Sequence, residues 1–293
     1  MMAVFLLILL TVLLFFIKDP YEMFGNMINS APSFAHLFGT DAFGRDLLSR
    51  TIVGLGYSLG IMLMALLIAI VIGVLVGLAS SLLPRWIGDW FMVVLDFLNS
   101  LPSIVYILIL ASLLEPTIFT LAFIIGCCSW MTMARQVRMM LLKEKQQAYV
   151  QMAKQIETTP LHRVVNYFIP AIYPVVAVTA IHEAIHIVLA EATISFLGLG
   201  LPVNTPTLGN LLMDAQNYFL VGAWWNVLFP GLFIGAIVMT LLRLKERLVR
   251  GGDSIDSNKK SFHFLRWPKD HTKCNTQLAK RSNRRVNGQK WDW

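Results

Sequence analysis

Long apolar runs separated by short polar stretches dominate the pattern of this chain. Six such runs occur, over residues 1–17, 58–83, 90–114, 117–133, 171–197 and 224–242. Each approaches the roughly 20 residues that an α-helix needs to cross a bilayer. Because backbone polar groups must be satisfied inside hydrocarbon, the pattern predicts six transmembrane helices and an all-α fold. Gly73 and Gly77 in the second run have the spacing that lets a neighbouring helix approach closely.

The composition supports a polytopic membrane protein. Of the 293 residues, 56% are hydrophobic and 14% are charged, and the mean hydropathy is +0.64. Soluble domains carry about a quarter charged residues. The net charge of +7 is concentrated in the central polar segment and after residue 242, which favours cytoplasmic faces and anionic lipid over nucleic acid. The three cysteines show no disulfide framework.

Charge also predicts the orientation in the membrane. The connection 134–170 carries six basic and two acidic residues, and such an excess marks a cytoplasmic loop. The connection 198–223 has Asp214 as its only formal charge, as expected for an outside loop or a re-entrant segment. With six spans, both termini lie in the cytoplasm.

One polar segment with helical periodicity, YVQMAKQIETTPLHRVVNYFIP at 149–170, resembles a known docking loop. Permease subunits of binding-protein-dependent ABC importers present to their ATPase the pattern Glu-Ala-Ala, three residues, Gly, nine residues, Ile-x-Leu-Pro. Here Gln151, Met152 and Ala153 stand on the first three places. Glu157 replaces the Gly, and Tyr167, Ile169 and Pro170 stand on the last places.

Three flanking stretches resemble the dipeptide, oligopeptide and nickel branch of these permeases. They are GTDAFGRDLLSRTIVG at 39–54, ARQVRMMLLKEKQQAYV at 134–150 and AEATISFLGLGLPVNTPTLGNLL at 190–212. The resemblance covers roughly residues 39–250 and implies the type I permease fold. Together with the apolar runs, it predicts a first transmembrane helix (1–18), an extracytoplasmic segment with an entry helix (19–57) and a five-helix core (58–250) with a cytoplasmic coupling loop (134–170). The composition of residues 251–293 predicts a basic, solvated and partly disordered cytoplasmic tail, to which the resemblance does not extend.

The resemblance also implies partners. They are a second, non-identical homologous permease, two ATPase subunits, an extracytoplasmic solute-binding protein and the lipid of a bacterial plasma membrane. No phosphate-binding Gly-x-x-x-x-Gly-Lys-Ser/Thr string occurs in the chain, so ATP and Mg²⁺ are expected on the partner subunits and no cofactor on this chain. The residues expected to contact the ATPase are Gln151, Met152, Ala153, Glu157, Thr158, Pro160 and Arg163.

The string HEAIH at 182–186 fits H-E-x-x-H, which places two imidazoles one helical turn apart, ready to share a zinc ion. An intramembrane zinc metalloprotease is therefore an alternative function. Its third ligand is missing from the pattern, since Leu189 and Ala192 occupy the places of the extended motif. The stretch Leu95-Asp96-Phe97 departs from the second motif of intramembrane proteases at its Gly. A membrane scaffold is a further alternative, which the docking loop disfavours.

Polar residues inside the apolar runs have two interpretations. They face the helix bundle and hydrogen-bond one another, or they line the translocation path of a polar solute. The candidate path residues are Asp96, His182, Glu183, His186 and Glu191. Imidazole suits nickel, cobalt, copper and zinc, so His182 and His186 are candidates for a transient metal contact. The expected cargo is a nickel, cobalt or zinc ion, a metal chelate, or a di- or oligopeptide.

Overall fold

The computed structural model describes residues 18–23, 25, 27–147, 150–151, 164–202, 204–220 and 222–265. The chain divides into two compact units, Met1–Arg247 and Leu248–Trp293, and all contacts discussed below lie in the first. Within the described residues there are helices and turns but no β-strand, only an isolated bridge between Thr40 and Asp46. The all-α prediction is confirmed.

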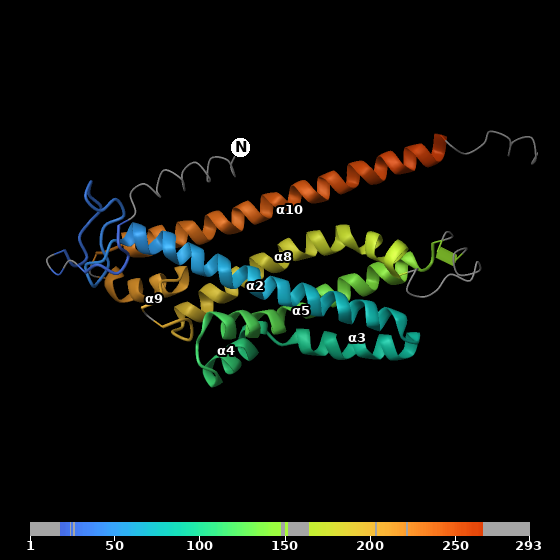
Figure 1. Ribbon diagram of the computed structural model, residues 1–293, viewed down its shortest axis with the longest axis horizontal. Coiled ribbons are helices and arrows are strands. Elements are labelled where there is room, and N and C mark those ends of the chain that lie inside the picture. Colours follow the sequence, from blue (N-terminus) through green and yellow to red (C-terminus); the bar gives the residue numbers. More distant parts are fainter. Residues whose placement is uncertain are drawn as a thin grey trace, which may run out of the picture. The chain divides into compact units, whose positions relative to one another are not determined.

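Among the described residues, four helices are long and apolar enough to cross a membrane. They are α2 (Leu47–Leu82), α5 (Ile118–Glu144), α8 (Ile169–Phe196) and the first part of α10 (Trp225–Leu265), which qualifies up to Arg250. Helices α2, α5 and α8 pack against one another, most extensively α2 on α5 (Figure 1). The first predicted span, 1–17, lies outside the described residues, so the count of six stays a prediction.

Close packing of α2 on α5 depends on glycines. A β-carbon built on Gly73 would lie 2.6 Å from Cβ of Met133, and one on Gly77 would lie 2.8 Å from the carbonyl oxygen of Ala134. From the other side, a β-carbon on Gly126 of α5 would lie 2.7 Å from the carbonyl oxygen of Ala65. The Gly73–Gly77 spacing on α2 therefore allows the close approach of α5 of the same chain.

The expected third span, 90–114, is not one straight helix. It consists of α3 (Arg85–Ser100) and α4 (Ser103–Leu113), bent by 78° at the intervening break. Pro102 explains the break, because its ring lacks a backbone N–H and disfavours helical backbone in the residue before it. Counted as one broken span, this pair raises the number of candidate spans in the described residues to five.

Two helices extend beyond the predicted spans. The predicted entry helix and second span form the single helix α2, which begins at Leu47 because Asp46 caps it and no proline interrupts it. The helix that contains the fourth predicted span also extends past Met133. Helix α5 continues to Glu144 because Val137 and Leu141 remain buried against the core, so the first third of the predicted coupling loop is helical.

The remaining elements connect these spans. The five-residue π-helix η1 (Val164–Phe168) precedes α8 directly. Helix α9 (Leu208–Phe219) lies in the connection between α8 and α10 and packs against α8 and α2. The Thr207 side chain caps α9 by accepting a hydrogen bond from the Asn210 backbone N–H at 3.2 Å.

Candidate functional site

Helix α8 separates the side chains of the HEAIH string onto two faces. The rings of His182 and His186 meet edge to face with their centroids 4.6 Å apart, as expected for residues one turn apart on a helix. Glu183 is one residue further along the chain and is only 5% exposed. Its carboxylate interacts with the Thr132 hydroxyl of α5. The glutamate therefore does not join the two imidazoles in one cluster.

A lysine, and not a metal-ligating side chain, contacts the histidine pair. Nζ of Lys245 on α10 lies 3.3 Å from Nδ1 of His182. Among the described residues no group of three or more His, Cys, Asp or Glu side chains is arranged to hold a metal ion. The third ligand that a zinc protease requires is thus missing from the described part of the chain.

Glu191 lies at a junction of three elements and is 1% exposed. The Ser195 hydroxyl donates a hydrogen bond to its Oε1 at 2.9 Å, and the hydroxyls of Ser58 on α2 and Thr207 before α9 lie beside it. The Ser58 hydroxyl also accepts a hydrogen bond from the Leu208 backbone N–H at 3.2 Å. Glu191 therefore connects α8 to α2 and to the start of α9.

Asp96 on α3 forms an ion pair with Arg135 on α5. A second ion pair joins the same two helices, since Nη2 of Arg138 lies 2.6 Å from Oδ1 of Asp89. Arg138 also donates to the carbonyl oxygen of Ser80 on α2. Asp96, which was predicted inside a span, thus has a cationic partner. The two ion pairs join α3 to α5, and Arg138 also links α5 to α2.

The predicted ATPase-contact residues fall mostly outside the described residues. Gln151 is exposed, and its side chain donates to the carbonyl oxygen of Gln146 at 3.3 Å. Met152, Ala153, Glu157, Thr158, Pro160 and Arg163 lie outside the described part. Their flanks are helical on both sides, with α5 ending at Glu144 and η1 beginning at Val164.

The stretch GTDAFGRD forms a tight turn before α2 that two of its carboxylates hold together. Oδ1 of Asp41 accepts hydrogen bonds from the backbone N–H groups of Phe43 at 2.8 Å and Arg45 at 2.9 Å. Oδ2 of Asp41 accepts from Nε of Arg45 at 2.7 Å. Oδ2 of Asp46 accepts from the backbone N–H of Ser49 at 2.9 Å, and its Oδ1 lies 2.8 Å from Nδ1 of His36. The turn is held by its own carboxylates.

Arg50 on the first turns of α2 is 0% exposed. Its Nε lies 3.4 Å from Oδ2 of Asp41, but none of its three nitrogens has a hydrogen-bond partner within the described residues. A buried guanidinium so poorly satisfied is costly. The carboxylate of Asp214 on α9 lies within electrostatic reach of Arg50, and attraction between these two side chains offsets part of the cost of burying them.

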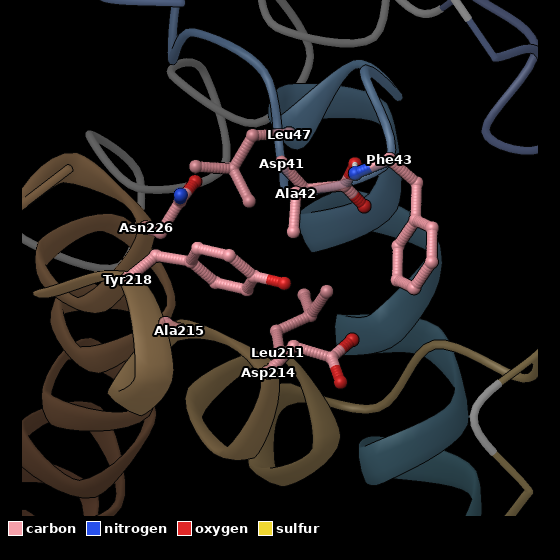
Figure 2. A pocket seen from close by; sticks show the side chains of 9 residues that line it. All are labelled: Asp41, Ala42, Phe43, Leu47, Leu211, Asp214, Ala215, Tyr218 and Asn226. Carbon is pink, nitrogen blue, oxygen red and sulfur yellow. Dashed lines mark hydrogen bonds between the residues drawn. The ribbon is translucent and has the colours of Figure 1, made fainter. Parts of the chain in front are cut away.

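A small pocket lies between the turn and α9 (Figure 2). Its volume of about 10 Å³ has room for one water molecule. Burial raises the pKa of Asp214 at its wall, and nearby Arg50 and Arg45 oppose this rise. The pocket is lined by Asp41, Ala42, Phe43, Leu47, Leu211, Asp214, Ala215, Tyr218 and Asn226.

The sequence alone did not predict that Asp41, Arg50 and Asp214 lie near one another. In the sequence, GTDAFGRD indicated only a family resemblance, and Asp214 was only the single charge of its loop. Two signals point to the cluster. Arg50 is a cation directly before a long apolar run, and Asp214 is an acid in an otherwise uncharged loop. Buried opposite charges in neighbouring segments tend to pair.

Comparison with known proteins covers most of the chain. Residues 69–251 match the family described as binding-protein-dependent transport system inner membrane component. A protein of Brucella suis biovar 1 named as a peptide permease is 32% identical over 251 residues, which cover 83% of this chain and 82% of that relative. The oligopeptide transport system permease protein OppC of Salmonella typhimurium is 36% identical over 217 residues, covering 73% and 70%. The OppC of Haemophilus influenzae is 32% identical over 233 residues, covering 78% and 75%.

Proposed function

Since the chain belongs to the binding-protein-dependent transport system inner membrane components, we propose that its cargo is a di- or oligopeptide. The chain is a multi-pass membrane protein with the type I permease fold of ABC importers, and it is a transport component and not an enzyme. An ATPase and a solute-binding protein are the partners of such a permease. The intramembrane metalloprotease alternative is withdrawn, because both the family and the absence of a third zinc ligand among the described residues speak against it.

One observation carries the peptide assignment. The relatives named as peptide or oligopeptide permeases align over 73% to 83% of this chain, so the likeness extends over most of its length. The remaining partners are part of the proposal. They are a second, non-identical homologous permease, two ATPase subunits carrying ATP and Mg²⁺, and the lipid of a bacterial plasma membrane, with both termini of this chain in the cytoplasm.

A metal ion or metal chelate is the second candidate cargo. The paired imidazoles of His182 and His186 favour it, since their rings lie 4.6 Å apart on one face of α8. The Lys245 ammonium opposes it, because a cation 3.3 Å from Nδ1 of His182 repels a metal and competes for that nitrogen. The peptide is therefore the better-supported cargo.

Uptake by the reconstituted importer tests both candidates. The chain, its partner permease, the ATPases and the binding protein are placed in liposomes containing ATP, and uptake of a labelled tripeptide is measured beside uptake of nickel with and without free histidine. We expect ATP-dependent uptake of the tripeptide. Uptake of nickel alone, abolished by His182→Ala with His186→Ala, would overturn the peptide assignment and support the metal.

The translocation path, as we propose it, runs beside α8 and includes Asp96, His182, Glu183, His186 and Glu191. Their contacts support different roles along it. Glu191 and Glu183 are buried and interact with hydroxyls of neighbouring elements. Asp96 and His186 are exposed, but Asp96 is paired with Arg135. His186 is thus an exposed side chain of the path that can contact a passing solute, while the two glutamates join α8 to its neighbours.

The segment with Gln151, Met152, Ala153, Glu157, Thr158, Pro160 and Arg163 is proposed as the ATPase contact. We expect Ala153→Arg to leave the importer assembled in the membrane but to abolish the increase in ATPase rate that the loaded binding protein produces. Gln147→Arg is the matched control, since Gln147 is an exposed residue of the same connection. An unchanged ATPase response in the Ala153→Arg importer would refute the assignment.

A further inference from the structure

Lys245 on α10 contacts a histidine, and no anionic partner of it lies among the described residues. In the described part of the chain it forms no ion pair, and its ammonium instead contacts Nδ1 of His182 at 3.3 Å. An ammonium has only hydrogen atoms to donate. His182 Nδ1 must therefore be the acceptor of this contact, and the proton of the neutral ring lies on Nε2.

The cluster of Lys245, His182 and His186 consequently presents donors. Lys245 keeps two further N–H groups, and His182 keeps its Nε2–H. His186, whose ring touches that of His182, is exposed and can donate from one ring nitrogen. A group of donors that includes one full positive charge is suited to a carboxylate, with which it forms charge-assisted hydrogen bonds.

The chain's own buried or path-side carboxylates are engaged elsewhere. Glu183 interacts with Thr132, Glu191 accepts from Ser195, and Asp96 pairs with Arg135. None of these three contacts involves the lysine–histidine cluster. Among the described residues, none supplies Lys245 with a carboxylate at ion-pair distance.

A lipid phosphate is the other anion to consider. Lys245 follows the sixth apolar run, 224–242, where basic residues of membrane proteins also meet lipid headgroups. The test below separates the two anions. Loss of a lipid contact would change the uptake of every peptide alike, whereas loss of a carboxylate subsite changes only the uptake of peptides that carry a carboxylate.

We propose that Lys245, His182 and His186 form a subsite for a carboxylate of the peptide as it passes this chain. The inference rests on the proposed function and deepens it, since it names the group of the cargo that the permease itself contacts. Lys245 supplies the charge, His182 orients the ammonium, and His186 meets the carboxylate from the exposed side. The contact is reversible, as transport requires.

The test compares peptides with and without a carboxylate in the reconstituted importer. Three labelled alanine-based tripeptides are used: one with a free C-terminus, one with a C-terminal amide, and one amide with a central glutamate. Uptake by Lys245→Met is divided by wild-type uptake for each peptide, so that any preference of the binding protein cancels. We expect uptake of the free acid to fall about tenfold, the effect of losing about 1.4 kcal/mol from a charge-assisted contact, and the plain amide to be unaffected.

The glutamate peptide separates two sources of the carboxylate. A loss with this peptide as large as with the free acid assigns the subsite to any carboxylate, and no loss assigns it to the C-terminus. Lys245→Arg should keep most of the uptake, because it keeps the charge. Arg243→Met, which removes an exposed cation of α10 two residues away, should leave all three rates unchanged.

Several results would overturn the subsite. They are equal uptake of the free acid by Lys245→Met and wild type, or an equal fall for the free acid and the plain amide in a variant that still purifies as an assembled complex. If the binding protein rejects amides, the free acid alone still gives a test: its uptake by Lys245→Met at the wild-type rate refutes the subsite. Failure of the wild type to take up any of the peptides would instead refute the proposed function.

Discussion

The glycines of α2 give the sharpest test of how the permease core is packed. An added methyl at Gly73 would lie 2.6 Å from Cβ and 2.7 Å from Cγ of Met133, and 2.9 Å from the carbonyl oxygen of Trp130. At Gly77 it would lie 2.8 Å from the carbonyl oxygen of Ala134. Backbone atoms and a β-carbon cannot rotate away, so α2 and α5 must separate.

Gly60 on the same helix is the matched control, because a β-carbon there meets no atom within 4 Å. All three substitutions gain a similar helix-propensity term of up to about 1 kcal/mol. Overpacking costs about 1–3 kcal/mol at a tight site. Relative to Gly60→Ala, we therefore expect Gly73→Ala and Gly77→Ala each to lower the free energy of unfolding by about 1–3 kcal/mol.

The assay is unfolding of the purified chain in mild detergent, titrated with a denaturing detergent and followed by tryptophan fluorescence. Matched pairs are compared, so the uncertain reference state of a membrane protein cancels. Equal stability of Gly73→Ala and Gly60→Ala, within about 0.5 kcal/mol, would refute the close approach of α2 and α5. A loss confined to the tight sites would support it.

Three further predictions concern charged side chains outside the histidine pair. Asp46→Ala removes the cap of α2, so thermal unfolding should show a loss of about 1–2 kcal/mol, and an unchanged melting temperature would contradict the cap. Burial raises the pKa of Asp214 above its ordinary value of 3.8, so the ionised side chain disfavours the fold as pH rises through the raised pKa. Asp214→Asn should therefore raise the melting temperature at pH 7 and lose this advantage at acid pH below 3.8, whereas a pH-independent effect would refute the electrostatic cause. Arg138→Met removes the bonds to Ser80 and Asp89 and should lower the free energy of unfolding by about 1–2 kcal/mol. High salt should reduce only the part of this loss that comes from the ion pair with the exposed Asp89. Arg247→Met, which changes an exposed cation, is its control.

The sequence was sufficient for the broad architecture. The apolar runs around α2, α5, α8 and α10 are long enough to require helices, because hydrocarbon leaves no other way to satisfy their backbone. The Gly73–Gly77 spacing correctly indicated close helix packing. The resemblance of GTDAFGRD and the central segment indicated the family that the comparison identifies.

Boundaries were less predictable than elements. The continuation of α5 to Glu144 places Arg135 and Arg138 on a helix, whereas their charge alone suggested a loop. Their ion pairs with Asp96 and Asp89 explain why the helix tolerates these charges. The break at Pro102 was readable from the residue type, but its 78° angle depends on the packing of α3 and α4.

The chemistry of the polar residues was decided only by the tertiary structure. HEAIH fixed which side chains share a face of α8, because that follows from 3.6 residues per turn. It did not fix that Lys245, 63 positions later, would face His182, or that Asp214 on α9 would come within electrostatic reach of Arg50 on α2. Local periodicity is encoded by neighbouring residues, whereas the partner of a buried charge is selected by how distant helices pack.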